Sequence, residues 1–407
     1  MKLPIAWQKK RLEKLVQFSS GGTPSKSKPE FWQGDIPWIS AATMHQQEIV
    51  TSELHISEDG LKAGSKLAKK NDLLLLVRGS MLWKKVPICI CKRDVAFNQD
   101  VKALRINGKI TPTYLLYWFL AHQRFLLNKV VGTGIGAGKF DLDELKALDV
   151  PLPPLPEQKA IADMLSTWDE AIEKTERLIQ AKEANLKGQI QRIMGKEAIE
   201  VNGWSMVHLG ELFSEVTRKV GEKELTPYSI SAGIGFVSQR EKWGKDISGS
   251  QHKNYTHLKA GEFSYNKGNS KRYQQGCVYL LKDGEICVPN VFISFKPKAK
   301  NVVPEFFEHY FIADYHAREL KRYITSGARS DGLLNLNKKD FFKIMVPCPS
   351  PDEQKAIAEA LTASQHEIDL LKQLADKYKT QKRGLMQKML TGEWRVKPEI
   401  VNQYMEA

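Results

Sequence analysis

The chain has few cysteines, no long apolar run and no recognisable secretion signal. Its five cysteines in 407 residues include no Cys-x-x-Cys pair, which argues against a disulfide framework and against a zinc knuckle. No run of apolar residues comes near the ~18 that a membrane span requires. The opening MKLPIAWQKK contains no apolar stretch like that of a signal peptide. We therefore expect a cytoplasmic protein with reduced thiols and no membrane partner.

Catalytic motifs that the chain partly resembles are incomplete. Adenine methyltransferases hold the extruded base with an Asn/Asp-Pro-Pro-aromatic loop, but the Pro153-Pro154 pair lies between leucines. The glycine cluster at residues 132–139 departs from the phosphate loop GxxxxGK[ST], because Thr133 and Phe140 occupy positions that need glycine and a hydroxyl. We expect a flexible loop here, with Lys139 in contact with phosphate.

Metal sites are also not indicated. Asp352, Glu353 and Lys355 resemble a metal-nuclease box, but consecutive residues at a helix start do not converge on one ion as residues of adjacent strands do. The nine histidines show no HxxxH or HExxH spacing. Cys89 and Cys91 share one face of a strand without further ligands nearby. We predict no catalytic residue, no metal and no cofactor in this chain.

Positive charge is concentrated in two blocks. The formal net charge of the whole chain is +14. Residues 1–150 carry +9 and residues 201–346 carry +7, whereas 151–200 carry −2 and 347–407 carry no net charge. Basic blocks therefore alternate with blocks of little net charge. This pattern indicates that the basic parts bind a polyanion.

The two halves of the chain repeat one another. Shifting the sequence by 196 places Glu157-Gln158-Lys159-Ala160-Ile161-Ala162 on an identical run that begins at Glu353, with 14 identities over 42 positions. A shift of 197 places Trp7 on Trp204. A repeat of this length indicates two copies of one module. We divide each copy into a globular part and a helical spacer, with the boundaries of the charge blocks: 1–150, 151–200, 201–346 and 347–407.

Each spacer is predicted to be a long helix with an apolar seam. Prolines up to Pro156 argue against a helix before Glu157, which opens an acidic first turn that suits the helix dipole. A helix over residues 157–193 is ~55 Å long, and its heptad seam predicts an antiparallel coiled coil with the second helix. The alternative is that each helix packs on its own globular part. The seam residues are Ile161, Leu165, Trp168, Ile172, Ile179 and Leu186, and then Ile357, Leu361, Ile368, Leu371, Tyr378 and Leu385.

The globular parts combine short strands with an aromatic helix. In the first half, strands are expected at 36–39, 72–77, 86–91 and 101–106, and in the second at 228–230, 262–265, 277–281 and 291–295. Pro112–Leu120 and Pro304–Phe311 each begin with proline and carry an aromatic face, which is typical of a helix packed on a core. The predicted fold class is α+β, with two pseudo-symmetric globular domains joined by two long antiparallel coiled-coil helices.

Several segments resemble the specificity subunit (HsdS) of type I restriction-modification enzymes. The resemblance rests on Gly22-Thr23-Pro24-Ser25, on Ile36-Pro37-Trp38-Ile39-Ser40, on Asn71–Ser80, and on the proline-rich run before Glu157-Gln158. Looser versions follow at Pro227–Ser231, Ala260–Gly268 and Pro347–Gln354, and the second half lacks the Gly-Thr-Pro-Ser segment.

The resemblance implies two target-recognition domains that each read one half of a split double-stranded DNA site. It implies that the paired helices hold the domains apart and dock two methyltransferase subunits, which bind S-adenosylmethionine, and restriction subunits, which use ATP. It also implies that the chain itself is non-catalytic.

Candidate DNA-contacting residues lie in loops of the basic parts, because lysine and arginine bind phosphate while Arg, Lys, Asn and Gln read base edges. The first half offers Arg78, Lys84, Lys85, Lys92 and Arg93. The second half offers Asn266, Lys267, Asn269, Lys271, Arg272, Gln274, Gln275 and Arg329. Since the two sets differ, we expect an asymmetric target, with half-sites at most ~16 base pairs apart given the helix length.

Two other classes of protein are weighed against this interpretation. One is a self-contained DNA methyltransferase or endonuclease, which the incomplete motifs disfavour. The other is a structural coiled-coil adaptor whose basic domains bind RNA or protein. For a DNA-reading subunit we expect DNA affinity to fall steeply with salt, and the part of the affinity that salt does not remove to depend on the DNA sequence. These two properties distinguish it from such an adaptor.

Overall fold

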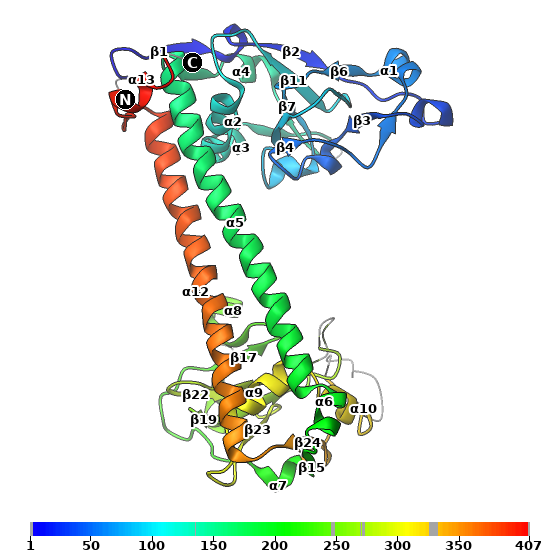
Figure 1. Ribbon diagram of the computed structural model, residues 1–407, viewed down its shortest axis with the longest axis vertical. Coiled ribbons are helices and arrows are strands. Elements are labelled where there is room, and N and C mark those ends of the chain that lie inside the picture. Colours follow the sequence, from blue (N-terminus) through cyan, green and yellow to red (C-terminus); the bar gives the residue numbers. More distant parts are fainter. Residues whose placement is uncertain are drawn as a thin grey trace. The chain divides into compact units, whose positions relative to one another are not determined.

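In a computed structural model, the chain forms two compact units (Figure 1). Unit 1 comprises Met1–Thr175 with Leu374–Ala407, and unit 2 comprises Glu176–Gln373. The described residues are 3–134, 136–245, 249–268, 270, 273–324 and 333–405. We describe each unit by itself.

Unit 1 is built on a five-stranded sheet beside a four-stranded one. The first has the order β2 (Val16–Ser20), β11 (Val101–Ile106), β7 (Leu73–Leu76), β9 (Ile88–Cys91) and β4 (Glu48–Ile49). The second has the order β5 (His55–Ile56), β3 (Ile36–Ile39), β10 (Val95–Phe97) and β6 (Lys66–Ala68). The strands predicted in this half are therefore confirmed.

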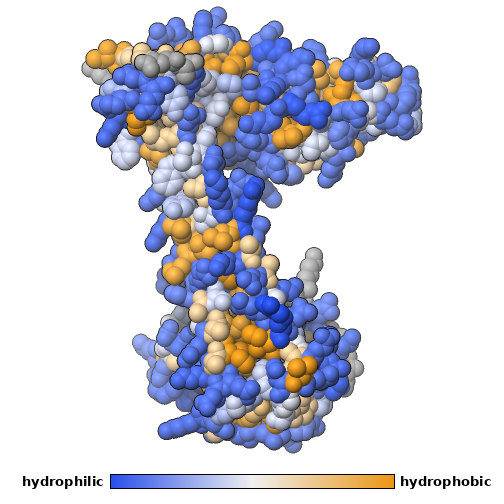
Figure 2. Space-filling view, viewed as in Figure 1, coloured by the Kyte–Doolittle hydropathy of each residue, from blue (hydrophilic) through white to orange (hydrophobic). Residues whose placement is uncertain are grey.

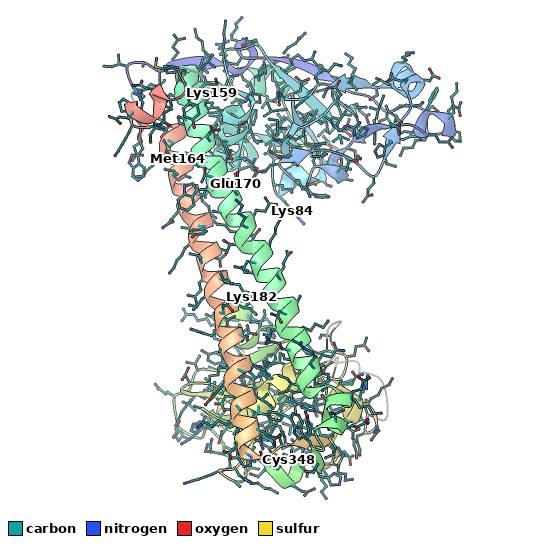
Figure 3. The ribbon with its side chains drawn as sticks, viewed as in Figure 1. Lys84, Lys159, Met164, Glu170, Lys182 and Cys348 are labelled. Atoms are coloured by element: carbon teal, nitrogen blue, oxygen red, sulfur yellow. The ribbon has the colours of Figure 1, made fainter. Side chains whose placement is uncertain are left out.

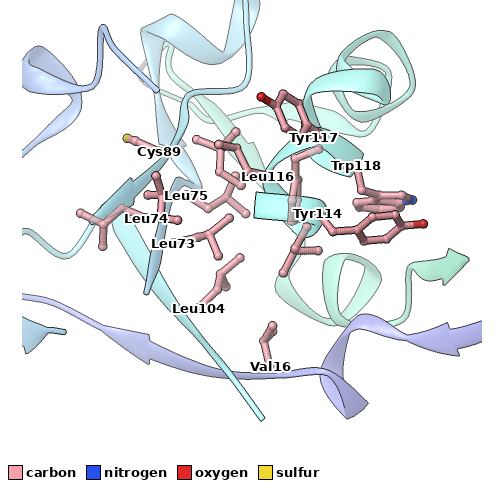
Figure 4. Close-up of a cluster of buried hydrophobic side chains, with 14 of the residues drawn as sticks. Val16, Leu73, Leu74, Leu75, Cys89, Leu104, Tyr114, Leu116, Tyr117 and Trp118 are labelled. Atoms are coloured by element: carbon pink, nitrogen blue, oxygen red, sulfur yellow. The ribbon is translucent and has the colours of Figure 1, made fainter. Parts of the chain in front are cut away.

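The core of unit 1 lies between the five-stranded sheet and helix α2 (Pro112–Ala121) (Figure 4). All four residues of β7 are buried, and such a continuous apolar run is typical of a strand covered on both faces. Helix α2 begins at Pro112, and the Thr111 hydroxyl caps it by accepting a hydrogen bond from the Tyr114 amide. Tyr114, Tyr117, Trp118 and Phe119 are buried, which confirms that the aromatic face serves the core.

Unit 2 repeats the central part of this arrangement. Its main sheet has the order β16 (Phe213–Glu215), β23 (Ile293–Pro297), β20 (Phe263–Asn266) and β21 (Cys277–Leu280). The pairs β19 (Thr256–Lys259) with β22 (Glu285–Val288), and β17 (Tyr228–Ser231) with β18 (Gly235–Ser238), accompany it. Helix α9 (Pro304–Ile312) takes the place of α2 and packs on β21. The strands predicted here are also confirmed.

A two-stranded ribbon joins the beginning and end of each globular part. In unit 1, β1 (Gln8–Arg11) pairs with β14 (Asp149–Leu152). In unit 2, β15 (Ser205–His208) pairs with β24 (Met345–Cys348). Since β14 and β24 each precede a long helix, the ribbons place the globular part directly at the helix start.

The long helices are α5 (Leu155–Met194) and α12 (Pro351–Leu390), each of 40 residues. Our prediction that no helix precedes Glu157 was wrong, because α5 begins two residues earlier and contains Pro156. Proline is tolerated in the first turn, where its missing N–H has no partner within the helix.

The two helices pack together antiparallel. Within unit 1 the beginning of α5 lies against the end of α12, as the ion pair of Asp169 with Lys382 shows. Within unit 2 the last part of α5 lies against the first part of α12, where the Ser364 hydroxyl donates to the Gln189 side-chain oxygen at 3.5 Å. Nearer the middle of α12, Glu183 pairs with Lys372 at 2.6 Å. The predicted pairing is confirmed.

Shorter elements complete the two units. In unit 1 they are α1 (Glu58–Gly64), β8 (Arg78–Gly79), a 3-10 turn (Ser80–Trp83), α3 (Gln123–Leu127), β12 (Val130–Gly132), β13 (Gly138–Phe140), α4 (Leu142–Lys146) and α13 (Pro398–Asn402). In unit 2 they are α6 (Lys196–Val201), α7 (Leu209–Leu212), α8 (Gln239–Trp243), α10 (Ala317–Lys321) and α11 (Lys338–Phe341).

Candidate nucleic-acid interface

The first group of basic side chains surrounds a small three-stranded sheet in unit 1. Strand β7 continues into β8, which pairs with β13, and β13 pairs with β12. Arg78 of β8 stands directly opposite Lys139 of β13, and both residues are exposed. Directly opposed residues of an antiparallel pair point to the same face, and two like charges there repel unless an anion lies between them. Neither side chain makes an ion pair with a described residue.

Lys139 also influences a neighbouring carboxyl. The pKa of Asp141 lies below its usual value, chiefly because the amides of Glu144 and Asp143 donate to it at the start of α4. Lys139 adds a smaller electrostatic contribution of the same sign. Both amides donate to Oδ1 of Asp141. Lys139 forms no ion pair with this carboxyl, so its ammonium stays available to an anion.

Trp83 closes the glycine-rich turn between β12 and β13. Its indole N–H donates to the Gly136 carbonyl at 3.0 Å, and 52% of the residue is exposed. A side chain at Gly138 would come within 2.7 Å of Val130 and 3.0 Å of Leu82, so this position requires glycine. The glycine-rich segment thus connects two paired strands, β12 and β13, whereas a phosphate loop connects a strand to a helix.

Lys84 and Lys85 follow the 3-10 turn that carries Trp83. Both backbone amides donate to the Met81 carbonyl, at 2.9 and 3.0 Å, and both residues are exposed. Figure 3 shows Lys84 at the surface of unit 1. Together with Arg78 and Lys139, these lysines form a group of four cations, here called the β8 cluster, and none of them has an ion-pair partner in the part of the chain that the structure describes.

Lys92 and Arg93 lie at the opposite end of the sheet. They follow β9, whereas Lys84 and Lys85 precede it. A four-residue strand spans ~13 Å. Lys92 forms an ion pair with Glu48 at 2.7 Å, and Arg93 is exposed. The structure thus divides the five basic residues predicted for the first half into two separate groups.

In unit 2 the corresponding loop uses some of its predicted residues to hold the fold. The Asn266 amide group donates to the Ile230 carbonyl at 3.2 Å, and its oxygen accepts from the Gly268 amide at 2.9 Å. The Lys267 ammonium lies 3.5 Å from the Leu336 carbonyl oxygen. Both residues are half-buried.

The other predicted residues of this half are partly described. Gln274 is exposed, and Gln275 is half-buried with its carbonyl accepting a hydrogen bond from the Tyr265 hydroxyl at 2.7 Å. Asn269, Lys271, Arg272 and Arg329 lie outside the described residues. Gly268 pairs with Leu333 in an antiparallel β-bridge, just as Gly79 of unit 1 pairs with Gly138. The two halves therefore present different side chains at an equivalent sheet edge.

The repeated Glu-Gln pair has a role that sequence reasoning did not find. Gln158 is fully buried: its oxygen accepts from the Thr111 amide at 2.8 Å, and its NH₂ donates to the carbonyls of Lys109 at 3.1 Å and Pro153 at 2.9 Å. Gln354 is equally placed, accepting from the Val303 amide and donating to the Pro349 carbonyl, both at 2.9 Å. Each glutamine fastens its long helix to the start of the aromatic helix.

The glutamate of each pair binds a tryptophan from the beginning of its module. The Trp7 indole donates to Glu157 at 3.0 Å, and the Trp204 indole donates to Glu353 at 3.3 Å. Arg395 also donates to Glu157, at 2.8 Å. The tryptophans repeat at a shift of 197 and the Glu-Gln runs at a shift of 196, and these nearly equal shifts were the signal that could have revealed the contact.

All twelve predicted seam residues are buried or half-buried. The buried ones are Ile161, Leu165, Ile179, Leu186, Leu361 and Ile368. The half-buried ones are Trp168, Ile172, Ile357, Leu371, Tyr378 and Leu385. In unit 1 the rings of Trp168 and Tyr378 meet edge to face, with centroids 5.6 Å apart.

Polar contacts within the helix pair differ between the units. In unit 1 Asp169 accepts hydrogen bonds from Lys382 and from the Tyr117 hydroxyl, the latter at 2.7 Å. The position that corresponds to Lys382 in the other helix is the buried Leu186. In unit 2 Lys182 forms an ion pair with Glu367 at 2.7 Å (Figure 3).

The cysteines and other metal-binding side chains form no site in the described residues. All five thiols are free, and burial raises the pKa of Cys91 and of Cys277 to about 12. No group of three His, Cys, Asp or Glu residues that could hold a metal ion occurs among the residues described. Among these residues, too, no helix is both long and apolar enough to span a bilayer.

Comparisons with known proteins point to one family. Residues 4–183 and 202–379 match the family described as type I restriction modification DNA specificity domain. The Escherichia coli protein named type I restriction enzyme EcoR124I/EcoR124II specificity subunit is 33% identical over 167 residues, which cover 40% of this chain and 41% of that protein. The Methanocaldococcus jannaschii protein named type I restriction enzyme MjaVIII specificity subunit is 23% identical over 427 residues, which cover 98% of this chain and 95% of that protein.

A solved structure shares the fold. The crystal structure of the type I restriction-modification system S subunit from M. genitalium superposes with a TM-score of 0.58 at 18% identity. The match covers 96% of this chain and 98% of that one. At this identity the likeness concerns the fold, and it agrees with two α+β domains and two long packed helices.

Proposed function

Because the chain belongs to the family of type I restriction-modification DNA specificity domains and is a non-catalytic specificity subunit, we propose that it binds a bipartite, asymmetric double-stranded DNA site. Residues 1–150 and 201–346 are the two target-recognition domains in this proposal. Residues 151–200 and 347–407 are the helical spacers. Each domain reads one half-site, and the base pairs between the half-sites are not read.

The observation that carries the proposal is one framework with two different surfaces. Four strands follow in the same order in both main sheets: β2, β11, β7 and β9 in unit 1, and β16, β23, β20 and β21 in unit 2. The third of these strands, β7 or β20, leads into a basic residue followed by glycine, Arg78-Gly79 or Lys267-Gly268. The residues around these two positions differ. An equivalent edge with different side chains is what two readers of different half-sites require.

In the first domain we assign phosphate binding to the β8 cluster. The Arg78–Lys139 pair places two positive charges on one face, and an anion between them would relieve their repulsion. Lys84 and Lys85 extend the positive surface from the adjacent turn. Trp83 offers an exposed ring that could stack on a base or cover the sugar, as aromatic side chains do in nucleic-acid sites. Lys92 and Arg93 are assigned a lesser contribution.

In the second domain the same proposal rests on fewer described residues. Gln274 is exposed and carries the amide that suits a base edge. Asn269, Lys271, Arg272 and Arg329 remain assigned to DNA binding on the sequence alone. Asn266 and Lys267 support the loop from beneath.

We also propose that the long helices dock two methyltransferase subunits and, through them, restriction subunits. S-adenosylmethionine and ATP would bind to those partners, and the assembly would act in the cytoplasm. Exposed leucines on the helices support a protein partner there: Leu178 and Leu370 in unit 2, and Leu374 in unit 1. Figure 2 shows apolar surface along the helices, which is costly to leave in water.

The test uses the chain assembled with its methyltransferase subunits. Sequencing genomic DNA for modified adenines, with and without the chain, would identify the target. Duplexes with and without that target would then be titrated at several salt concentrations. We expect a steep fall of affinity with salt and a large preference for the target. Equal affinity for all duplexes would refute the proposal.

Two double variants test the assignment within the first domain. Arg78→Ala with Lys139→Ala should weaken binding and reduce the slope of log affinity against log salt by about 2, one unit for each lost phosphate contact. Lys92→Ala with Arg93→Ala, the matched control at the opposite end of β9, should leave the slope nearly unchanged. The reverse result would place the DNA at the other end of the sheet.

A further inference from the structure

An exposed tryptophan in unit 2 has a lysine over its ring. Trp243 is the last residue of the short helix α8, which follows strand β18 and packs on it (Figure 1). Trp243 is 43% exposed, and the Lys242 ammonium lies 4.8 Å from the centre of its ring. Proteins that bind nucleic acid combine cations with aromatic rings in this way. Such a pair is informative through its position on the domain.

The pair lies beside the sheet edge that is proposed to bind DNA in the second domain. The Ile230 carbonyl of β17 accepts a hydrogen bond from the Asn266 side chain at 3.2 Å, and the Lys242 ammonium lies 3.5 Å from the same oxygen. Asn266 ends β20 and is followed by Lys267-Gly268. In the first half the equivalent edge, at Arg78-Gly79, carries the β8 cluster. The tryptophan and its lysine are therefore neighbours of the corresponding edge in the second half.

The backbone that carries the pair is well supported. Strands β17 and β18 are paired over four positions, and the Gly233 amide between them donates to the Tyr279 hydroxyl of β21 at 2.7 Å. The Ser238 hydroxyl caps α8 by accepting a hydrogen bond from the Glu241 amide at 3.1 Å. A surface held in place in this way loses little entropy when it binds a ligand.

Positive charge on this surface is not neutralised by the described part of the chain. Residues 239–245 contain three cations, Arg240, Lys242 and Lys245, and one acid, Glu241. All four side chains are exposed, and none of them forms an ion pair with a described residue. Uncompensated positive charge next to an exposed ring favours a partner that is both anionic and rich in flat or apolar surface, as a nucleotide is.

The first half does not carry these residues in the corresponding segment. Ile39-Ser40-Ala41 matches Ile230-Ser231-Ala232 at a shift of 191. At the same shift, residues 42–61 contain no lysine, arginine or tryptophan, whereas residues 233–252 contain Trp243 and all three cations. The surface is therefore a feature of the second domain and not of the framework that the two domains share.

The first half has its exposed tryptophan in a different segment. Trp83, which is followed by Lys84 and Lys85, comes after β8, whereas Trp243 comes before β19. Both halves thus set a tryptophan with lysines beside the end of a main-sheet strand. Because the two segments do not correspond in sequence, a common role in packing the framework does not explain the likeness. A common ligand does.

We propose that Lys242 and Trp243 bind one nucleotide of the half-site read by the second domain. The Lys242 ammonium binds the phosphate, and the exposed part of the Trp243 ring packs on the deoxyribose of the same nucleotide. Arg240 and Lys245 extend the positive surface toward neighbouring phosphates. This inference rests on the proposed function and deepens it, because it assigns to the second domain a contact that positions the duplex without reading a base.

The first test measures DNA affinity against salt for the chain assembled with its methyltransferase subunits, on its target duplex. Lys242→Ala should weaken binding and reduce the slope of log affinity against log salt by about 1. Trp243→Ala should weaken binding about tenfold, since the exposed part of the ring is no longer buried against the sugar, and should leave the slope unchanged. Trp243→Phe should recover part of that loss.

Unit 1 offers a matched control pair. The Lys388 ammonium lies 4.4 Å from the centre of the Trp394 ring, and Trp394 is 51% exposed. This pair has the same chemistry, but it belongs to the 347–407 block, which has no net charge, and Lys388 forms an ion pair with Glu393 at 3.1 Å. Lys388→Ala and Trp394→Ala should change neither the affinity for DNA nor its dependence on salt.

A second test locates the phosphate. Target duplexes are made with one methylphosphonate at a time, which removes a single negative charge from the backbone. At one position, within one half-site, this change should weaken binding by the unaltered complex and add little to the loss in Lys242→Ala, because the contact is then already absent. At positions in the other half-site the two losses should add.

Three outcomes would overturn the proposal while DNA binding by the unaltered complex stands. One is unchanged affinity and slope in Lys242→Ala, which alters an exposed side chain and so decides the test even if Trp243→Ala disturbs unit 2. Another is additive losses at every methylphosphonate. The third is weaker assembly with the methyltransferase subunits and unchanged DNA affinity, which would assign the surface to a protein. If the unaltered complex itself bound no duplex, the proposed function would fail, so the two failures are distinguishable.

Discussion

The two buried glutamines at the helix starts allow a sharp comparison within one chain. Gln158 makes three hydrogen bonds to backbone groups, and Gln354 makes two. Both side chains are almost completely buried. Replacing either with methionine keeps the length of the side chain and removes the hydrogen bonds, so the loss is not confounded by a large cavity.

The expected loss follows from the number of bonds. At about 1 kcal/mol for each net hydrogen bond, Gln158→Met should cost about 3 kcal/mol and Gln354→Met about 2 kcal/mol. Pro153 and Pro349 are buried, so their carbonyls would be left without a partner and would add to these losses. The damage should be local, because each glutamine holds one long helix to the aromatic helix of its own unit.

Amide hydrogen exchange measures each site separately. In Gln158→Met, protection of the Thr111 amide should fall by about two orders of magnitude, as 1.4 kcal/mol corresponds to a factor of ten. In Gln354→Met, the Val303 amide should lose a smaller factor, about 30. Each variant should leave the amide of the other unit protected.

Matched controls are available on the same helices. Gln191 and Gln387 occupy equivalent, exposed positions, and methionine there should change neither amide. If Gln158→Met left the Thr111 amide as protected as before, the glutamine would not be fastening the helix, and the explanation of the repeated Glu-Gln pair would be refuted.

Three further predictions concern the helices and one buried acid. Lys382→Met should destabilise unit 1 by about 1–2 kcal/mol in urea unfolding, which is less than for a fully buried ion pair because Asp169 is partly exposed. Adding Asp169→Asn should recover most of this loss, because the remaining partner is then no longer charged. Losses that simply add in the double variant would contradict this. Burial raises the pKa of Glu308 despite its ion pair with Lys282, so between the ordinary and the raised pKa the folded chain holds a proton that the unfolded chain has released. Stability of unit 2 should therefore fall as pH rises from the ordinary to the raised pKa of this carboxyl, and Glu308→Gln should abolish that dependence. Removing one heptad from both long helices keeps the seam in register and shortens each helix by ~10 Å. The two half-sites should then lie about three base pairs closer together, and the bases read in each half-site should stay the same. A changed half-site sequence would contradict this prediction.

Most of the fold could be predicted from local patterns. Prolines, the heptad seam and the aromatic stretches are properties of contiguous residues, and they located α5, α12, α2 and α9 to within a few residues. The repeat then implied that both halves share one fold. The start of α5 was missed because a proline pattern alone does not distinguish a residue before a helix from one in its first turn.

The candidate site could be predicted only in part. The sequence indicated which loops are basic, but proximity in sequence grouped Arg78 with Lys92 and Arg93, which β9 separates. It could not reveal that Lys139, some 60 residues further along, stands opposite Arg78, because strand pairing is a long-range contact.

What the sequence by itself determined is the duplicated module, its two basic halves and its two apolar-striped helices. These follow from composition and periodicity, which act over a few turns or strands. What only the tertiary structure decided is which polar groups meet: Gln158 with the start of α2, Trp7 with Glu157, and Asn266 and Lys242 with the Ile230 carbonyl. Hydrogen bonds depend on distances of a few tenths of an ångström between residues far apart in the chain, and no local pattern encodes such distances.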